Sequence, residues 1–258
     1  MIESTLRLVD FQTAIASNGI RLITAAYVPS PWSEAAKSIF SMKKLPFVVA
    51  KVVGSDPAFQ SWGRSPNVPV LLNDDEAPRT GWAEILMLAE KLAPEPSLVP
   101  PSAEDRARMF GLSHEILGDN GLLWNARLVG IDASLESGGK ESFPLQVAER
   151  LAPRYGWSKG CSERAKARTI ESLALLDREL AKTSGPYFFG DRLTALDVYA
   201  ATMLGALAPL PDALCSMLPR LRATFEGMGA ALGVAIPPAL LRLRMKMYEE
   251  HLETPLAI

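Results

Sequence analysis

A proline-rich segment divides this chain of 258 residues into two parts with different sequence patterns. Pro94, Pro96, Pro100 and Pro101 fall close together, and proline disrupts both helices and central strands because it has no backbone N–H. The segment therefore predicts a linker, which we place at residues 94–102. Strand-like apolar runs occur only before it, whereas the long segments after it have helical periodicity. We expect an α/β domain followed by an all-helical domain.

The first part alternates between strand and helix signals. Apolar runs rich in β-branched residues predict buried strands, and they occupy residues 19–27, 46–53 and 67–74. Apolar residues at helical spacing predict helices over 31–44 and 82–92. In the second part, residues 102–135 form one continuous segment of helical pattern.

These signals give four expected regions. Residues 1–18 carry no clear pattern and are treated as an N-terminal extension. The α/β domain is expected at 19–93, the linker at 94–102 and the helical domain at 103–258.

The composition excludes several classes of protein. The net charge is −2, from 27 basic and 29 acidic residues, so no large field of one sign indicates nucleic acid or an anionic membrane as a partner. The two cysteines, Cys161 and Cys215, form no C-x-x-C pair, which argues against a metal site or a dithiol redox centre. The N-terminus lacks the pattern of a signal peptide, and no apolar run is long enough for a membrane span. We expect a cytoplasmic protein.

Ser30 stands between two prolines, where a predicted strand gives way to a predicted helix. Two interpretations are open. A serine before a proline at the first helical position is a favoured helix N-cap. Alternatively, its hydroxyl faces a bound thiol, since a hydroxyl and a helix N-terminus both stabilise a thiolate.

Pro69 lies inside the third apolar run, within the sequence Asn-Val-Pro-Val-Leu. A trans proline is tolerated at the start of a strand, and this is the commoner case. A cis bond would instead turn the Val68 backbone outward and leave its N–H and C=O free for a ligand.

Thr194 and Asp197 have the spacing of a capping box before an apolar helix. In this motif Thr194 would accept from the Asp197 backbone N–H, while the Asp197 side chain reaches back to the cap. Its role is structural, and we assign it no part in catalysis.

Together, four motifs resemble those of the glutathione transferase superfamily, over roughly residues 20 to 230. The similar segments are the catalytic-residue motif at 30–37, the cis-proline motif at 67–71, the third helix of the family at 83–92 and its folding motif at 190–204. The resemblance implies a thioredoxin-like domain followed by an all-helical domain. It also implies glutathione as cosubstrate and a homodimer.

The resemblance assigns roles to particular residues. Ser30 would be the catalytic residue beside the glutathione sulfur, with Ser33 as a second candidate near the ligand. Val68 and Pro69 would contact glutathione. The family usually carries Glu-Ser at the start of its third helix, which holds the γ-glutamyl end of glutathione.

Here Thr80 and Gly81 stand in place of that pair, so the acid that binds the ligand's ammonium group is missing. Thr80 would still offer a hydrogen bond. The Gly81 N–H or Arg79 would meet a carboxylate, and Glu84 is one candidate for the absent acid.

Other residues are weaker candidates. Gln60 and Trp62 fall where relatives contact the glycyl end of the ligand, although packing is the simpler role for Trp62. His114 and Arg127 lie on a helical segment that would line the cosubstrate pocket. A lone histidine on a helix is more often a surface or satisfied core residue than a catalyst, and Arg127 would reach either the cleft or solvent.

Two classes of function follow from these residues. The first is a glutathione transferase that joins glutathione to a small electrophile, or a related isomerase or disulfide reductase that uses glutathione. The second is a binding or interaction protein that keeps the fold without transferase activity.

Overall fold

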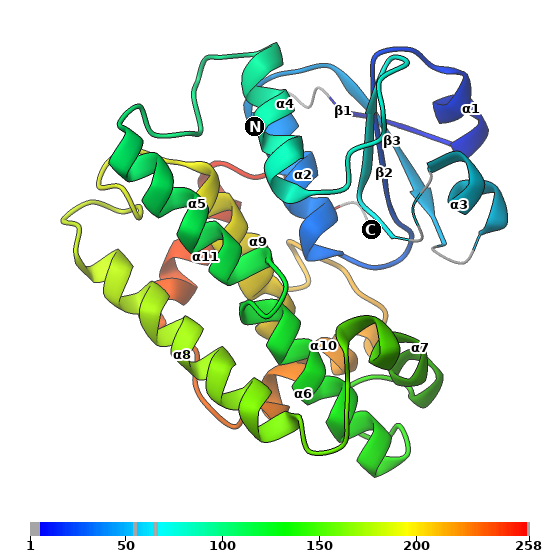
Figure 1. Ribbon diagram of the computed structural model, residues 1–258, viewed down its shortest axis with the longest axis vertical. Coiled ribbons are helices and arrows are strands. Elements are labelled where there is room, and N and C mark those ends of the chain that lie inside the picture. The colour runs from blue at the N-terminus through cyan, green and yellow to red at the C-terminus, as the bar shows by residue number, and fades with distance from the viewer. Residues whose placement is uncertain (1–5, 54–55, 64, 66, 257–258) are drawn as a thin grey trace.

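The computed structural model describes residues 6–53, 56–63, 65 and 67–256, which form an α/β domain and a helical domain (Figure 1). Four strands make one mixed sheet in the order β1-β3-β2-β4. Strands β1 and β2 run parallel to β3, and β4 is antiparallel to β2. The strands and helices of this domain are β1 (Leu6–Val9), α1 (Phe11–Ala16), β2 (Ile20–Ala25), α2 (Pro31–Met42), β3 (Phe47–Val52), α3 (Pro57–Gly63), β4 (Val70–Asn73) and α4 (Trp82–Leu92).

The sheet is buried on both faces because its strands are apolar on both sides. On β2, Leu22 belongs to the main core, whereas the next residue, Ile23, belongs to a smaller core on the opposite face. This alternation is the period of two that a strand imposes on its side chains. Helices α2 and α4 cover the main core, and α1 and α3 cover the smaller one through residues such as Ala14 and Phe59.

The structure incorporates much of the N-terminal segment that the sequence leaves outside the first domain. Strand β1 pairs with β3 from Leu6 opposite Phe47, and α1 begins after Asp10, whose side chain accepts the Thr13 N–H at 2.8 Å. The sequence signal was weak because this strand has four residues at an edge of the sheet, and Leu8 is 52% exposed. A short, half-exposed edge strand has little of the apolar pattern that marks central strands.

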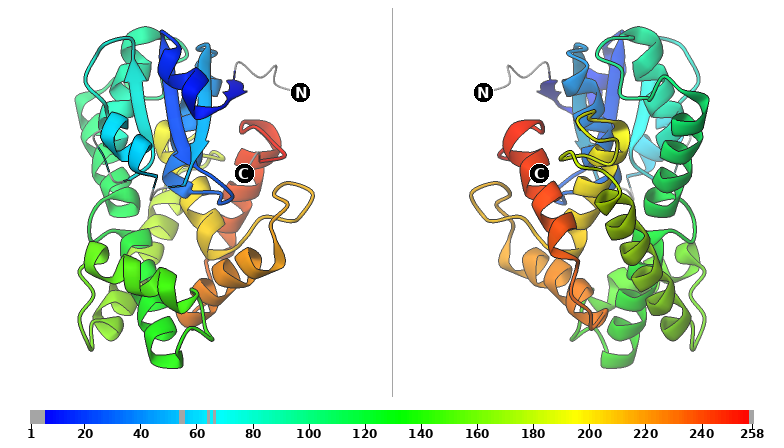
Figure 2. Two further views of the ribbon diagram at one scale, coloured as in Figure 1. Left: turned by 90° about the vertical axis from the view of Figure 1, so that its right-hand side faces the viewer. Right: turned by 90° about the vertical axis from the view of Figure 1, so that its left-hand side faces the viewer.

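Within the described residues, seven helices follow the linker. They are α5 (Ala103–Leu117), α6 (Leu122–Ser137), α7 (Leu145–Tyr155), α8 (Ser162–Ala181), α9 (Ala195–Leu207), α10 (Pro219–Ala231) and α11 (Pro238–Glu250). Helix α9 is buried along almost its whole length, as expected of a helix that is apolar on every side. Helix α11 packs against α9, and the chain after α11 reaches the first domain (Figure 2).

The continuous helical pattern over 102–135 was misleading, because the structure has two helices there. They are separated at Gly118 and Gly121. A Cβ atom at Gly118 would lie 2.3 Å from the His114 ring, and one at Gly121 would lie 2.9 Å from backbone carbonyl oxygens. Glycine is required at this close approach, and apolar spacing alone does not reveal it.

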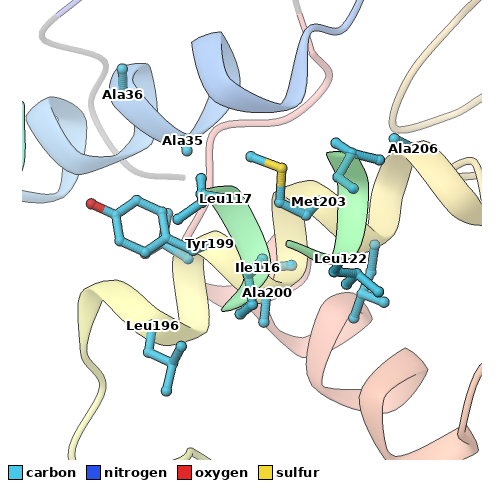
Figure 3. Close-up of a cluster of buried hydrophobic side chains, with 14 of the residues drawn as sticks. Ala35, Ala36, Ile116, Leu117, Leu122, Leu196, Tyr199, Ala200, Met203 and Ala206 are labelled. Atoms are coloured by element: carbon cyan, nitrogen blue, oxygen red, sulfur yellow. The ribbon is translucent and has the colours of Figure 1, made fainter. Parts of the chain in front are cut away.

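The two domains share one hydrophobic core. Helix α2 of the first domain packs on α9 of the second, and the contact also includes Leu117 at the end of α5 (Figure 3). Ala35 and Ala36 of α2 are buried there together with Tyr199 of α9. Their small side chains let the two helices approach closely, which fixes α2 between the sheet and the helical domain.

The capping motif at α9 is confirmed, with one change in its hydrogen bonds. The Asp197 carboxylate accepts the Thr194 N–H at 2.8 Å and also the Thr194 hydroxyl at 3.0 Å. It further accepts the Phe188 N–H at 3.0 Å. The Asp197 N–H donates to the Thr194 carbonyl rather than to its hydroxyl. Burial raises the pKa of Asp197 from 3.8 to about 6, although these hydrogen bonds act in the opposite direction.

This shift predicts a pH-dependent stability. A raised folded-state pKa gives stability that is complete below about pH 3.8 and is lost as the pH rises through about 6. The Asp197→Asn variant resembles the protonated side chain and does not titrate. The free energy of unfolding of the wild type, minus that of Asp197→Asn, is therefore expected to fall by about 2–3 kcal/mol between pH 4 and pH 7. Urea unfolding across this range measures the difference, and Asp191→Asn on the exposed surface is the control. A difference that stays constant would contradict the assignment.

Candidate functional site

A cavity of about 860 Å³ lies between the two domains and brings together most of the residues expected from the sequence. Ser30, Val68, Pro69, Thr80 and Gly81 all line it. They come from the N-cap of α2, the two residues just before β4 and the loop before α4.

The Ser30 hydroxyl does not cap its helix. Ser30 occupies the N-cap position of α2 and its carbonyl accepts the Glu34 N–H at 2.8 Å, but its side chain makes no capping hydrogen bond. Pro31 follows at the first helical position, where a missing N–H costs nothing. The backbone of Ser30 therefore starts the helix, while its side chain is left for the cavity.

Ser33 lies elsewhere. It is 1% exposed and is not among the residues that line the cavity. Its hydroxyl is buried without a hydrogen-bond partner among the described residues. The structure thus separates the two candidate serines, one in the cavity and one in the core.

The Val68–Pro69 bond is cis, which agrees with the motif indicated by the family resemblance rather than with the commoner trans form. Next to it, the Gly81 N–H already has a partner. Glu84 reaches back from the first turn of α4 and accepts this N–H at 3.3 Å. Arg79 pairs with Glu76 and does not line the cavity. Thr80 is exposed at the cavity wall.

The opposite wall belongs to the helical domain, and a stack of three side chains joins it to Trp32 of α2. The Arg127 guanidinium lies 4.7 Å from the centre of the Trp32 ring and 5.5 Å from that of Tyr155, and it donates to the Tyr155 hydroxyl. The Trp32 indole N–H donates to the Leu117 carbonyl at 3.1 Å. Trp32 follows Ser30 on α2, so this stack joins the two domains at the cavity.

Two arginines of α7, Arg150 and Arg154, also line this wall, and the sequence analysis missed both. Desolvation lowers the pKa of Arg154, Tyr155 opposes this, and the charges of Arg127 and Arg150 lower it further. Their four-residue spacing places them on one helix face. That face is visible in the sequence, but nothing there says that it turns toward the first domain.

The weaker candidates from the sequence also differ in whether they line the cavity. Gln60 and His114 line the cavity. Trp62 instead packs on Phe11, with ring centres 5.6 Å apart, which confirms the packing interpretation. Among the described residues, no cluster of His, Cys, Asp or Glu is suited to hold a metal ion, and none of the helices is long and apolar enough to cross a membrane.

Comparison with known proteins identifies the architecture. Residues 159–232 match the sequence family described as glutathione S-transferase, C-terminal domain. A glutathione S-transferase from Methylobacterium radiotolerans, solved in complex with glutathione sulfonate, superimposes with a TM-score of 0.59. At 19% identity, the alignment covers 93% of this chain and 98% of that one.

This chain has the glutathione S-transferase fold.

Two further structures agree with this conclusion. A glutathione S-transferase from Methylobacillus flagellatus with glutathione bound has a TM-score of 0.55 at 14% identity, covering 87% of this chain and 98% of that one. A bacterial maleyl pyruvate isomerase of the zeta class has a TM-score of 0.51 at 18% identity, covering 88% of this chain and 97% of that one. No curated protein matches by sequence. The thioredoxin-like and all-helical domains of the glutathione transferase fold, expected from the motifs, are confirmed.

The stack at the cavity gives a prediction about stability. Trp32→Phe keeps a ring beside Arg127 but removes the indole N–H, which leaves the Leu117 carbonyl without this donor. We expect the free energy of unfolding to fall by about 1–2 kcal/mol, as measured by urea denaturation. Trp124→Phe is the matched control, because Trp124 also lines the cavity and contacts the Tyr155 ring at 4.5 Å. Equal losses in the two variants would show that the hydrogen bond contributes nothing.

Proposed function

We propose that this protein is a glutathione-dependent transferase whose Ser30 hydroxyl stabilises the glutathione thiolate. The observation that carries the proposal is the state of Ser30: it begins α2, lines the interdomain cavity and leaves its hydroxyl out of the helix cap. Relatives of the same fold bind glutathione or its sulfonate, which supports glutathione as the cosubstrate.

The chemistry follows from this placement. Ser30 donates a hydrogen bond to the thiolate, and the first N–H groups of α2 add the positive end of the helix dipole. Both favour the ionised sulfur, so the thiol proton passes to solvent near neutral pH. The sulfur then forms a bond to an electrophilic carbon while the leaving group departs with its bonding electrons. Ser30 acts as a hydrogen-bond donor and not as the nucleophile, since no His, Asp or Glu among the described residues is hydrogen-bonded to its hydroxyl as a general base.

Other residues of the cavity would bind the parts of glutathione away from its sulfur. Val68 beside Pro69 would offer its backbone N–H and C=O to the ligand, and Thr80 one hydroxyl. The residue at 80 is not an acid, so this position gives the ammonium group of glutathione no carboxylate. The Gly81 N–H, which would meet a carboxylate of the ligand, is engaged by Glu84. We therefore expect wild-type binding to be weak, in the millimolar range.

Glutathione titration calorimetry on three variants tests this assignment. Thr80→Glu supplies the carboxylate and is expected to tighten binding roughly tenfold, because a charge-assisted hydrogen bond contributes about 1.5–3 kcal/mol. Ser30→Ala is expected to raise the pKa of the bound thiol by roughly 1–2 units. Thiolate absorbance recorded against pH measures this shift. Ser33→Ala is the matched control, since this serine belongs to the same helix but is buried in the protein core.

A second candidate function is a binding or interaction protein without transferase activity. The Thr80-Gly81 pair favours it, because it removes the side chains that relatives use to hold glutathione. If wild type does not bind glutathione at millimolar concentration and Thr80→Glu does not restore binding, the transferase proposal fails. If Ser33→Ala rather than Ser30→Ala shifts the thiol pKa, the catalytic serine is misassigned.

The proposal also includes a homodimer and a cytoplasmic location, both of which stay predictions from the resemblance and the sequence. Sedimentation analysis of the full chain measures the first directly. A glutathione-dependent isomerase or disulfide reductase would use the same thiolate, and assays with glutathione disulfide distinguish the reductase.

A further inference from the structure

The wall of the cavity formed by the helical domain is strongly cationic. It contains Arg127, Arg150 and Arg154, and the only carboxylate among the described lining residues is Asp119. Within the described part of the chain, none of the three arginines takes part in an ion pair, although arginines elsewhere, such as Arg108 and Arg168, do. The imbalance is therefore local to this wall and is not a property of the whole chain, whose net charge is −2.

Arg127 is held in a way that a freely solvated arginine is not. Its guanidinium is stacked between Trp32 and Tyr155, and one of its nitrogens donates to the Tyr155 hydroxyl. Its Nε is buried without a hydrogen-bond partner among the described residues. Stacking on aromatic faces fixes the plane of the guanidinium and presents its edge to a ligand.

Arg150 and Arg154 add two more charges from the next helix. Like charges four residues apart on a helix destabilise it, so this pair carries a cost in the empty protein. Burial lowers the pKa of Arg154, and the positive charges of Arg127 and Arg150 lower it further. An anion between them would relieve the repulsion, and carboxylates bind such forked donors in a bidentate manner.

We propose that the electrophilic cosubstrate is an anion, a carboxylate attached to a planar, conjugated body, whose carboxylate binds Arg127, Arg150 and Arg154. This inference rests on the proposed transferase function and specifies its substrate class. The partly exposed rings of Trp32, Trp82 and Trp124 line the same cavity and offer apolar surface to a planar body. Glutathione would occupy the opposite wall, at Ser30, Val68 and Thr80, so the two ligands have separate sets of partners.

A matched pair of electrophiles tests the inference. 4-Chloro-3,5-dinitrobenzoate and its methyl ester lose chloride in the same substitution but differ in the charge of one group. For each, kcat/KM is divided by the rate constant of the uncatalysed reaction with glutathione, which removes the difference in intrinsic reactivity. The wild type is expected to prefer the carboxylate at least roughly tenfold, as expected from one charge-assisted hydrogen bond.

Arg150→Ala and Arg154→Ala are expected to reduce this preference roughly tenfold each, with little change for the ester. Both arginines are exposed at the rim, so their replacement should not affect folding. Arg164→Ala on α8 is the matched control, since it removes one exposed positive charge outside the cavity and should leave the preference unchanged.

Binding without glutathione separates this inference from the transferase proposal. The full chain is titrated with unreactive 3,5-dinitrobenzoate, and separately with its methyl ester, while its tryptophan fluorescence reports binding. If the acid binds more tightly than the ester, and Arg150→Ala and Arg154→Ala weaken it, the anion site stands even when glutathione does not bind. If glutathione binds but neither assay distinguishes acid from ester, the inference is overturned. It is also overturned if the arginine variants weaken glutathione binding as much as they weaken the acid, because the arginines would then hold glutathione itself.

Discussion

The contact between α2 and α9 is the interaction on which the rest of the structure depends. Helix α2 belongs to the α/β domain, yet its alanines are buried against the central helix of the other domain. The two domains therefore have one continuous core and are not two bodies joined only by the linker. Since Ser30 is the N-cap of α2 and Trp32 lies in its first turn, the same contact sets the position of the candidate serine relative to both walls of the cavity.

The two walls of the cavity have different chemistry. The α/β domain contributes small polar groups and backbone at Ser30, Val68 and Thr80, together with the rings of Trp32 and Trp82. The helical domain contributes the arginines, together with the rings of Trp124 and Tyr155. Such a division suits a reaction between two ligands that need different environments: a thiolate held by neutral donors, and a partner drawn in by charge. Trp32 joins the two walls, since it bonds to Leu117 and stacks with Arg127.

The sequence predicted those parts of the fold that depend on local pattern. The strands at Ile20–Ala25 and Phe47–Val52 and the helix at Pro31–Met42 are apolar or amphipathic enough to be read directly. Strand β1 was not, because its burial depends on pairing with β3 and not on its own residues. The break at Gly118 was hidden for a related reason, since the close approach that requires glycine exists only in three dimensions. The site shows the same limit: motifs led to Ser30 and Pro69, but only packing shows which way Arg150 and Arg154 face.

The cap of α4 has a consequence for how this site would change over evolutionary time. A side chain added at Gly81 would begin 3.0 Å from the Glu84 carboxylate, which now satisfies the Gly81 N–H. A serine at this position would accept the Glu84 backbone N–H with its hydroxyl, while the Glu84 carboxylate would still accept the N–H of residue 81. Serine and Glu84 satisfy different groups of the same helix end, so they are compatible once the flexible Glu84 side chain has shifted slightly to make room. A lineage that gains a serine here therefore keeps Glu84 and completes a reciprocal capping box, with no second substitution needed.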